Sequence, residues 1–152
     1  MLYLLALLIG VIAGLRAMIA PAAVAWAAHL GWIDLSASPL AFMSHAWTPW
    51  IFTVLAVIEL ITDQLPSTPS RTVPMQFGAR LVSGALCGAC LGAAGGNLAV
   101  GAVLGAIGAV IGTLGGRSVR GRLAASFGKD RPAALIEDAV AIIGAALIVM
   151  VP

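Results

Sequence analysis

Long apolar runs separated by short polar stretches dominate the chain. A helix that crosses a membrane needs about 20 consecutive apolar residues, with a range of roughly 17 to 25. Five runs are candidates, at residues 2–28, 49–64, 79–94, 98–115 and 132–151. The pattern therefore predicts an all-α membrane protein that forms one integral membrane domain over residues 1–152, with about five transmembrane helices.

The first apolar run is interrupted twice. Arg16 lies inside it, and Pro21 lacks the backbone N–H that a continuous helix needs. We expect this helix to be kinked or broken near Arg16–Pro21, and a complete break would divide it into two half-helices. The run differs from a signal peptide because no Lys or Arg precedes it and an Arg lies within it, so we expect a retained span.

The connections differ in character. Three prolines make residues 65–78 a turn-rich loop, and the residues 95–97 (Gly-Gly-Asn) predict a tight turn between the third and fourth helices. Residues 116–131 are predicted to be an exposed loop or a short surface helix. Asp130 as a cap and Pro132 near the first helical position favour the start of a fifth helix there.

Composition supports the assignment to the membrane. Hydrophobic residues make up 61% of the chain and charged residues 9%, whereas a soluble domain carries about a quarter charged residues. The net charge of +2 is small and scattered, which excludes nucleic acid as a main partner. The expected partners are membrane lipids.

Basic residues and tryptophans predict an orientation. Five of the eight Lys and Arg residues fall between the fourth and fifth spans, at Arg117, Arg120, Arg122, Lys129 and Arg131. The positive-inside rule places this segment and Arg71 in the cytoplasm, so five spans put the N-terminus in the cytoplasm and the C-terminus in the periplasm. The four tryptophans flank the linker expected at the outer interface, where indoles are favoured: Trp26, Trp32, Trp47 and Trp50.

Glycines recur every four residues in the third and fourth spans. The two stripes are Gly84, Gly88, Gly92 and Gly96, and Gly108, Gly112 and Gly116. Small residues at this spacing let helix backbones pack closely in lipid, which predicts glycine-zipper packing. The stripes either seal a hairpin within one subunit or form the seam of a homodimer or higher homo-oligomer.

Two cysteines form a C-x-x-C motif in the third span. Cys87 and Cys90 lie among glycines, without a second cysteine pair or a nearby His. We interpret them as part of the small-residue packing surface and predict no cofactor.

Ionisable residues inside the predicted spans carry the functional hypothesis. A charge at membrane depth costs several kcal/mol unless a partner or water compensates for it. Arg16 is about 21 Å along its helix, with Glu59 expected nearby. We expect one polar, substrate-binding cluster that opens to the cytoplasm, formed by Arg16, Glu59, Asp63, Arg71, Arg80, Arg117, Glu137 and Asp138. The alternative is a set of ion pairs that only fixes the helix register.

A weak internal similarity also exists. Residues 9–16 resemble residues 111–117, and residues 57–59 resemble residues 135–137. The members of each pair lie three spans apart, so they would be inverted repeats, as in many transporters. Chance similarity between glycine-rich apolar segments is the alternative.

Several short motifs together resemble one family. They are Gly14-Leu15-Arg16, the acidic helix end with Glu59, Asp63 and Pro66, the glycine-rich middle, and Glu137-Asp138. With these motifs the chain resembles the small bacterial membrane proteins grouped as domain of unknown function 4126. The resemblance implies a location in the bacterial inner membrane and supplies no activity.

Three functions fit the sequence. The favoured one is a small transporter or channel for a small polar or ionic solute, with the intramembrane Arg and Glu residues forming its site. A lipid-phosphate or headgroup-acting enzyme is the first alternative, with Glu59 and Asp63 as acid and base or as ligands of a divalent cation. A structural, partner-binding membrane subunit is the second.

Overall fold

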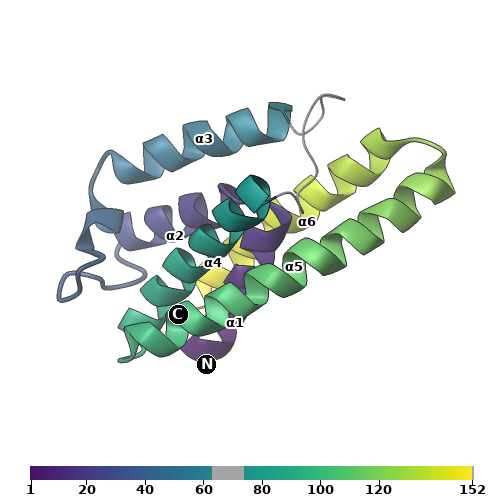
Figure 1. The fold of residues 1–152 in the computed structure, drawn as a ribbon. Coiled ribbons are helices and arrows are strands. Elements are labelled where there is room, and N and C mark those ends of the chain that lie inside the picture. Colours follow the sequence, from purple (N-terminus) through teal and green to yellow (C-terminus); the bar gives the residue numbers. More distant parts are fainter. Residues whose placement is uncertain (63–73, 152) are drawn as a thin grey trace.

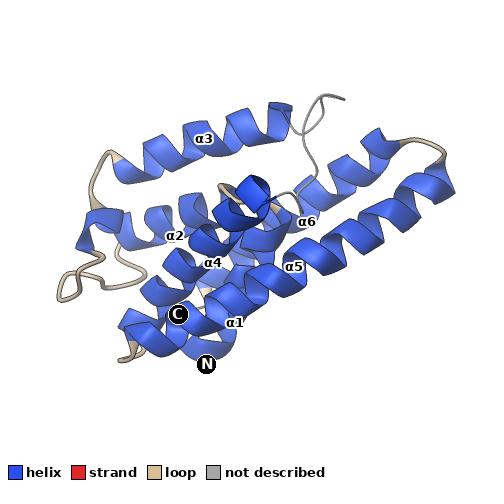
Figure 2. Ribbon diagram, in the orientation of Figure 1, coloured by secondary structure: helices blue, strands red, loops and turns tan. Residues whose placement is uncertain are grey.

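The computed structural model of the chain is a bundle of helices (Figures 1 and 2), and it describes residues 1–62 and 74–151 except for the side chain of Asp130. The helices are α1 (Leu2–Leu15), α2 (Ile19–His29), the 3-10 helix η1 (Ala41–Ser44), α3 (Thr48–Thr62), α4 (Pro74–Ala94), α5 (Leu98–Phe127) and α6 (Asp130–Met150). The described residues contain no strand, which confirms the all-helical prediction.

Three of these helices are long and apolar enough to cross a membrane. They are α4, α5 and the part of α6 from Arg131 onward, and they indicate a multi-pass membrane protein. The other three α-helices contain 14, 11 and 15 residues, fewer than the roughly 20 that a span requires. Of the five expected spans, the described residues therefore show three long apolar helices that could cross a membrane, beside three shorter α-helices.

The fourth predicted span extends well beyond its expected end. The prediction of a loop or a short separate helix from residue 116 is wrong, because α5 continues without interruption to Phe127. Six of the twelve residues from 116 to 127 are Arg, Leu or Ala, which favour helix. Gly128 then ends the helix with φ +71°, a left-handed conformation that glycine adopts without strain.

The first apolar run is two helices that reverse direction. The α1 helix stops at Leu15, and Arg16 is extended, with φ −141° and ψ 112°. At the start of α1, the Tyr3 hydroxyl donates to the carbonyl oxygen of Gly95 at 3.2 Å. The expected break near Arg16–Pro21 is thus confirmed, and it divides residues 2–28 into two helices. We call residues 2–29 the re-entrant hairpin.

Contacts along α2 establish its direction. At its start the backbone N–H of Met18 contacts Glu59, and further along the Trp26 indole donates to the Thr53 hydroxyl at 2.9 Å. The helix thus runs antiparallel to α3, and its last turn lies beside η1, where the His29 ring is 3.1 Å from the carbonyl oxygen of Ser44.

Both termini consequently lie at one end of the bundle (Figure 1). Because α1 runs antiparallel to α6, with Ile12 against Gly144 and Arg16 against Asp138, the start of α1 lies near the end of α6. The expected location of the termini on opposite sides differs from this arrangement, because α2 turns back along the bundle after α1 (Figure 1). Trp26 and Trp32 line a cavity with Val149 and Met150 at this end, and Trp50 packs against Trp26. We call this end the tryptophan end, and we call the end with the α5–α6 turn the basic end.

The α1 helix is central, and glycines let it approach its neighbours. A Cβ built on Gly10 would lie 2.1 Å from the Gly105 carbonyl oxygen, so these two backbones touch. Gly84, Gly88 and Gly92 contact α5 in the same way, and Gly108 and Gly112 contact α1. The last glycine of each stripe differs. Gly96 lies in the α4–α5 turn with φ +98°, and Gly116 lines a cleft. The glycine faces in contact are thus used within the chain.

The same contacts fix the relative direction of α1 and α5. Gly10 lies on Gly105, and Gly14 lies on Ala109 and Gly112, so both helices run the same way. An inverted repeat requires opposite directions for residues 9–16 and 111–117. That prediction is wrong for this pair of segments.

Gly88→Ala tests the close approach of α4 and α5. A Cβ there would lie 2.2 Å from the Gly101 carbonyl oxygen, so we expect a loss of about 1–3 kcal/mol in the free energy of unfolding, measured by thermal unfolding in detergent. Gly121→Ala is the matched control, because its Cβ meets nothing within 4 Å and alanine favours helix by up to about 1 kcal/mol. Equal melting temperatures for the two variants would contradict the packing.

Candidate functional site at the hairpin tip

The tip of the re-entrant hairpin, residues 14–18, interrupts the helical hydrogen-bond pattern. Backbone N–H and C=O groups released there need new partners inside the protein, because hydrocarbon offers none and each unsatisfied group costs several kcal/mol. The partners are side chains from α3, α4 and α5.

Two released N–H groups are bound by one carboxylate. The backbone N–H of Ala17 donates to Oε2 of Glu59 at 3.0 Å, and the N–H of Met18 donates to Oε1 at 3.3 Å. Both bonds lie at the start of α2, where the helix dipole also favours a negative charge. Glu59 therefore acts as the N-terminal cap that the α2 sequence itself does not supply.

The carbonyl oxygen of Gly14 is bound from two other helices. It accepts a hydrogen bond from Nη1 of Arg80 at 2.7 Å and one from the Thr113 hydroxyl at 3.4 Å. Arg80 is 3% exposed, and its positive charge lies at the C-terminal end of α1, where the helix dipole favours it.

The carbonyl oxygen of Ala17 needs a new hydrogen-bond donor for a different reason. In a helix it would accept from the N–H four residues later, but that residue is Pro21, which has no N–H. The Ser83 hydroxyl of α4 donates to this oxygen instead. Pro21 thus leaves the Ala17 carbonyl oxygen without its helical N–H donor, and a side chain of α4 donates to it instead.

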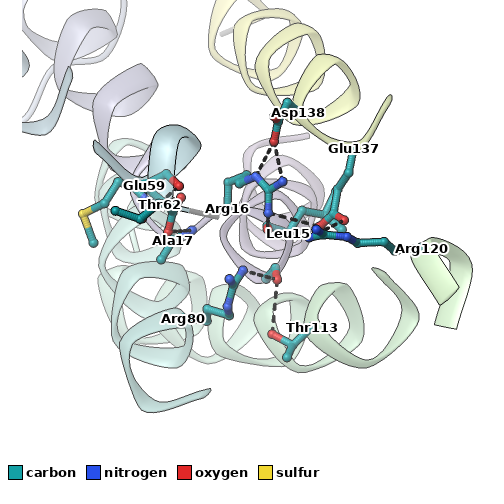
Figure 3. A network of polar contacts seen from close by, with 12 residues as sticks. Leu15, Arg16, Ala17, Glu59, Thr62, Arg80, Thr113, Arg120, Glu137 and Asp138 are labelled. Atoms are coloured by element: carbon teal, nitrogen blue, oxygen red, sulfur yellow. Dashed lines mark hydrogen bonds and ion pairs between the residues drawn. The ribbon is translucent and has the colours of Figure 1, made fainter. Parts of the chain in front are cut away.

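Arg16 is fully buried between acidic residues of α6 (Figure 3). Its Nε donates to Oδ1 of Asp138 at 2.6 Å, and Nη2 forms an ion pair with the same oxygen. Nη1 donates to the Leu15 carbonyl oxygen at 3.3 Å and lies 3.6 Å from Oε1 of Glu137. Oε2 of Glu137 lies 3.8 Å from Nη1 of Arg120, so charges of alternating sign connect α5, α6 and the tip.

The tip lies well inside the bundle. Fourteen residues separate Arg16 from Leu2 and Arg80 from Ala94, and the helical rise converts this separation to about 21 Å from the tryptophan end. The hydrocarbon layer of a membrane is about 30 Å thick, so this distance exceeds half of that thickness. We call the tip and the side chains bound to it the tip cluster.

The structure brings together five of the predicted site residues: Arg16, Glu59, Arg80, Glu137 and Asp138. Arg16 points to Asp138 and Glu137, on the other side of the tip from Glu59, which differs from the expected approach of Arg16 to Glu59 (Figure 3). Arg117 is exposed on α5, one turn beyond Thr113. Asp63 and Arg71 lie outside the described residues. A role of any of these residues in substrate binding stays a prediction.

Three members of the tip cluster were missed from the sequence: Ser83, Thr113 and Arg120. Ser83 follows Arg80 by three residues and therefore shares its helix face, a signal that was present. Thr113 directly follows Gly112, so the sequence pattern indicates a small packing residue there and gives no sign of its hydrogen bond. Arg120 belongs to the stretch that was expected to be an exposed loop or a short surface helix, so its position on a helix continuous with the fourth span could not be used.

A cavity reaches the tip from the α4 side. Its volume is about 340 Å³, it lies between α2, α3 and α4, and its walls include Met18, Phe52 and Ser83. Among residues 1–62 and 74–151, no group of three or more His, Cys, Asp or Glu side chains is arranged to hold a metal ion.

Comparison with known proteins gives a family. A family model described as a domain of unknown function, DUF4126, matches residues 3–152. No curated protein and no solved structure matches the chain.

A double-mutant cycle tests the coupling of Arg16 with Asp138. Asp138→Leu removes the main partner of a fully buried guanidinium, so we expect a loss of about 3–5 kcal/mol in the free energy of unfolding. Arg16→Met combined with Asp138→Leu should lose clearly less than the sum of the single changes. Thermal unfolding in detergent measures all four proteins, and additive losses would argue against the coupling.

Proposed function

The chain belongs to the DUF4126 family, and we propose that it is a small bacterial inner-membrane transporter or channel for a small polar or ionic solute. The observation that carries this proposal is the re-entrant hairpin, whose polar tip is held at membrane depth by side chains of α3, α4 and α5.

Interrupted helices with polar tips favour transport chemistry. In transporters, the ends of half-helices provide N–H groups and carbonyl oxygens that bind solutes and ions near the middle of the membrane. Here α1 presents the Gly14 carbonyl oxygen, and α2 presents the N–H groups of Ala17 and Met18. A re-entrant backbone is tolerated at this depth only where protein buries it or water reaches it.

The present partners of the tip indicate how a solute binds. A solute with oxygen atoms competes with Glu59 for the two N–H groups of α2. A solute with N–H groups or positive charge competes with Arg80 for the Gly14 carbonyl oxygen. The cavity between α2, α3 and α4 gives access, because Met18 and Ser83 belong both to its walls and to the tip cluster.

The scaffold and assembly follow from the glycine contacts. We propose that α1, α4 and α5 form a glycine zipper, with backbone contact at Gly10, Gly88 and Gly105. These three helices hold the side of the tip that carries Arg16. Homodimer formation stays a prediction, and it requires a surface other than these occupied glycine faces.

Basic residues again give an orientation, now with the corrected fold. The positive-inside rule places the basic end in the cytoplasm. The tryptophan end, with both termini, then faces the periplasm. Asp34 lies in the exposed linker at that end, where hydrogen bonds from the Ser36 hydroxyl and N–H hold the pKa of its carboxyl below the ordinary value.

Glu59→Gln tests the proposed site. The change keeps the side-chain shape but removes the charge and one acceptor from the two N–H bonds, each bond to a charged group being worth about 1.5–3 kcal/mol. In proteoliposomes with fluorescent indicators for H⁺, K⁺, Na⁺, Cl⁻ and phosphate, we expect flux of at least one of these ions above protein-free vesicles. Because the amide competes less strongly than the carboxylate for these two N–H groups, Glu59→Gln should leave them more available to the solute and raise that flux by roughly tenfold.

Arg16→Ala should lower the flux, because it removes the buried side chain that holds the tip against α6, and Asp34→Asn is the matched control. Asp34→Asn removes one negative charge far from the tip, so its flux should equal that of the unchanged protein. Size-exclusion profiles verify that each variant is folded. Flux that is the same in Glu59→Gln, Arg16→Ala and the unchanged protein would remove the proposed site.

Two cysteine variants test the orientation. Ala37→Cys places a thiol in the exposed linker of the tryptophan end, and Ser126→Cys places one near the α5–α6 turn. A membrane-impermeant maleimide added to intact spheroplasts should label Ala37→Cys and leave Ser126→Cys unlabelled until the membrane is opened. The unchanged chain is the control, because Cys87 and Cys90 are buried. The reverse labelling pattern would invert the topology.

A further inference from the structure

A second cavity lies at the basic end, and the hydrogen bonds of the tip cluster do not explain why it is long and apolar. It has a volume of about 300 Å³ and lies between α5 and α6, with α1 as its floor. Its walls are almost entirely apolar and include Val11, Val119, Ile136 and Val140. We call this cavity the α5–α6 cleft.

The cleft is elongated. Its wall on α5 runs from Ile111 to Leu123, which is about 18 Å along the helix axis. Gly115 and Gly116 lie within this stretch, and a Cβ built on Gly115 meets nothing within 4 Å. An apolar cleft of this length with a volume of only about 300 Å³ fits a hydrocarbon chain. It does not fit a protein helix, which is about 10 Å wide with its side chains.

Positive charge accompanies these apolar walls. Arg120 belongs to the cleft wall, and its side chain is 16% exposed, with Nη1 3.8 Å from Oε2 of Glu137. Further basic side chains are exposed around the same end of the bundle, at Arg117, Arg122, Lys129 and Arg131. Basic pockets between membrane helices attract anionic lipid headgroups. Apolar walls beside a cationic rim are complementary to an acyl chain that carries an anionic headgroup.

We propose that the α5–α6 cleft binds one acyl chain of an anionic phospholipid, whose phosphate is held by Arg120 and the neighbouring exposed basic side chains. The site goes beyond the proposed transport function and does not depend on it, because a lipid can occupy the cleft whether or not a solute passes the tip. Its location at the basic end places it in the cytoplasmic leaflet under the proposed orientation.

Lipid retention measured by native mass spectrometry tests the site. The full-length protein is delipidated in detergent and then mixed with phosphatidylglycerol or phosphatidylcholine of the same acyl chains. We expect one tightly retained lipid and a roughly tenfold preference for phosphatidylglycerol. Equal retention of the two lipids by the unchanged protein would overturn the proposal.

Gly115→Leu and Gly121→Leu form a matched pair on α5. Both positions have open space at Cβ, but only Gly115 lines the cleft. A leucine at 115 fills the cleft, so we expect retention of phosphatidylglycerol to fall by about tenfold, while Gly121→Leu retains it fully. Equal retention by the two variants would contradict binding in the cleft.

Arg120→Gln provides a second arm that does not alter the apolar walls, and it decides the case if Gly115→Leu fails to fold. The variant loses the positive charge at the cleft, so its retention of phosphatidylglycerol should fall toward that of phosphatidylcholine, with phosphatidylcholine unchanged. An undiminished preference for phosphatidylglycerol would overturn the role of Arg120 and with it the proposed headgroup site.

Discussion

The need to hydrogen-bond backbone groups at membrane depth governs the arrangement of this molecule. A chain that turns inside a bilayer releases N–H and C=O groups where no water can bind them. At residues 14–18 the released groups are bound by Glu59, Arg80, Ser83 and Thr113, which come from three different helices. The position of each of these helices is thereby tied to one short segment of backbone.

The glycine contacts and the tip cluster depend on each other. Thr113 has a short side chain, and its hydroxyl reaches the Gly14 carbonyl oxygen only because α1 and α5 nearly touch. A Cβ on Gly14 would lie 2.5 Å from the Ala109 carbonyl oxygen, so any larger residue there would separate the two helices. Close packing therefore does more than stabilise the bundle: it brings short polar side chains within hydrogen-bonding distance of the tip.

Much of this arrangement follows from simple sequence patterns, and the limits have physical causes. Apolar runs and a Gly-Gly-Asn turn predict α4, most of α5, and α6, because length and hydropathy are local properties. Arg16 and Pro21 mark the interruption of the first run. They do not reveal the reversal, because a kinked span and a hairpin contain the same local signals and differ only in the tertiary course of the chain (Figure 1).

The site was predictable to a similar degree. Buried charges need partners, so the convergence of Arg16, Glu59 and Asp138 follows from the cost of isolating them in hydrocarbon. Which charge meets which is set by tertiary packing. Glu59 binds backbone N–H groups instead of Arg16, because the broken helix supplies donors that a continuous helix would not expose.

The two sides of the tip differ in how firmly they are held, and this difference bears on the proposed transport. Arg16 is fully buried and bound to α6, within the part of the bundle that α1, α4 and α5 pack tightly. Glu59 is carried by α3, which packs mainly against α2 and η1 and buries only Pro49 and Ala56 among its residues. A displacement of α3 would withdraw the carboxylate from Ala17 and Met18 without breaking the pair of Arg16 with Asp138. Under the proposed function, α3 is thus the element whose movement frees the N–H groups for a solute, while the buried arginine holds the tip in place.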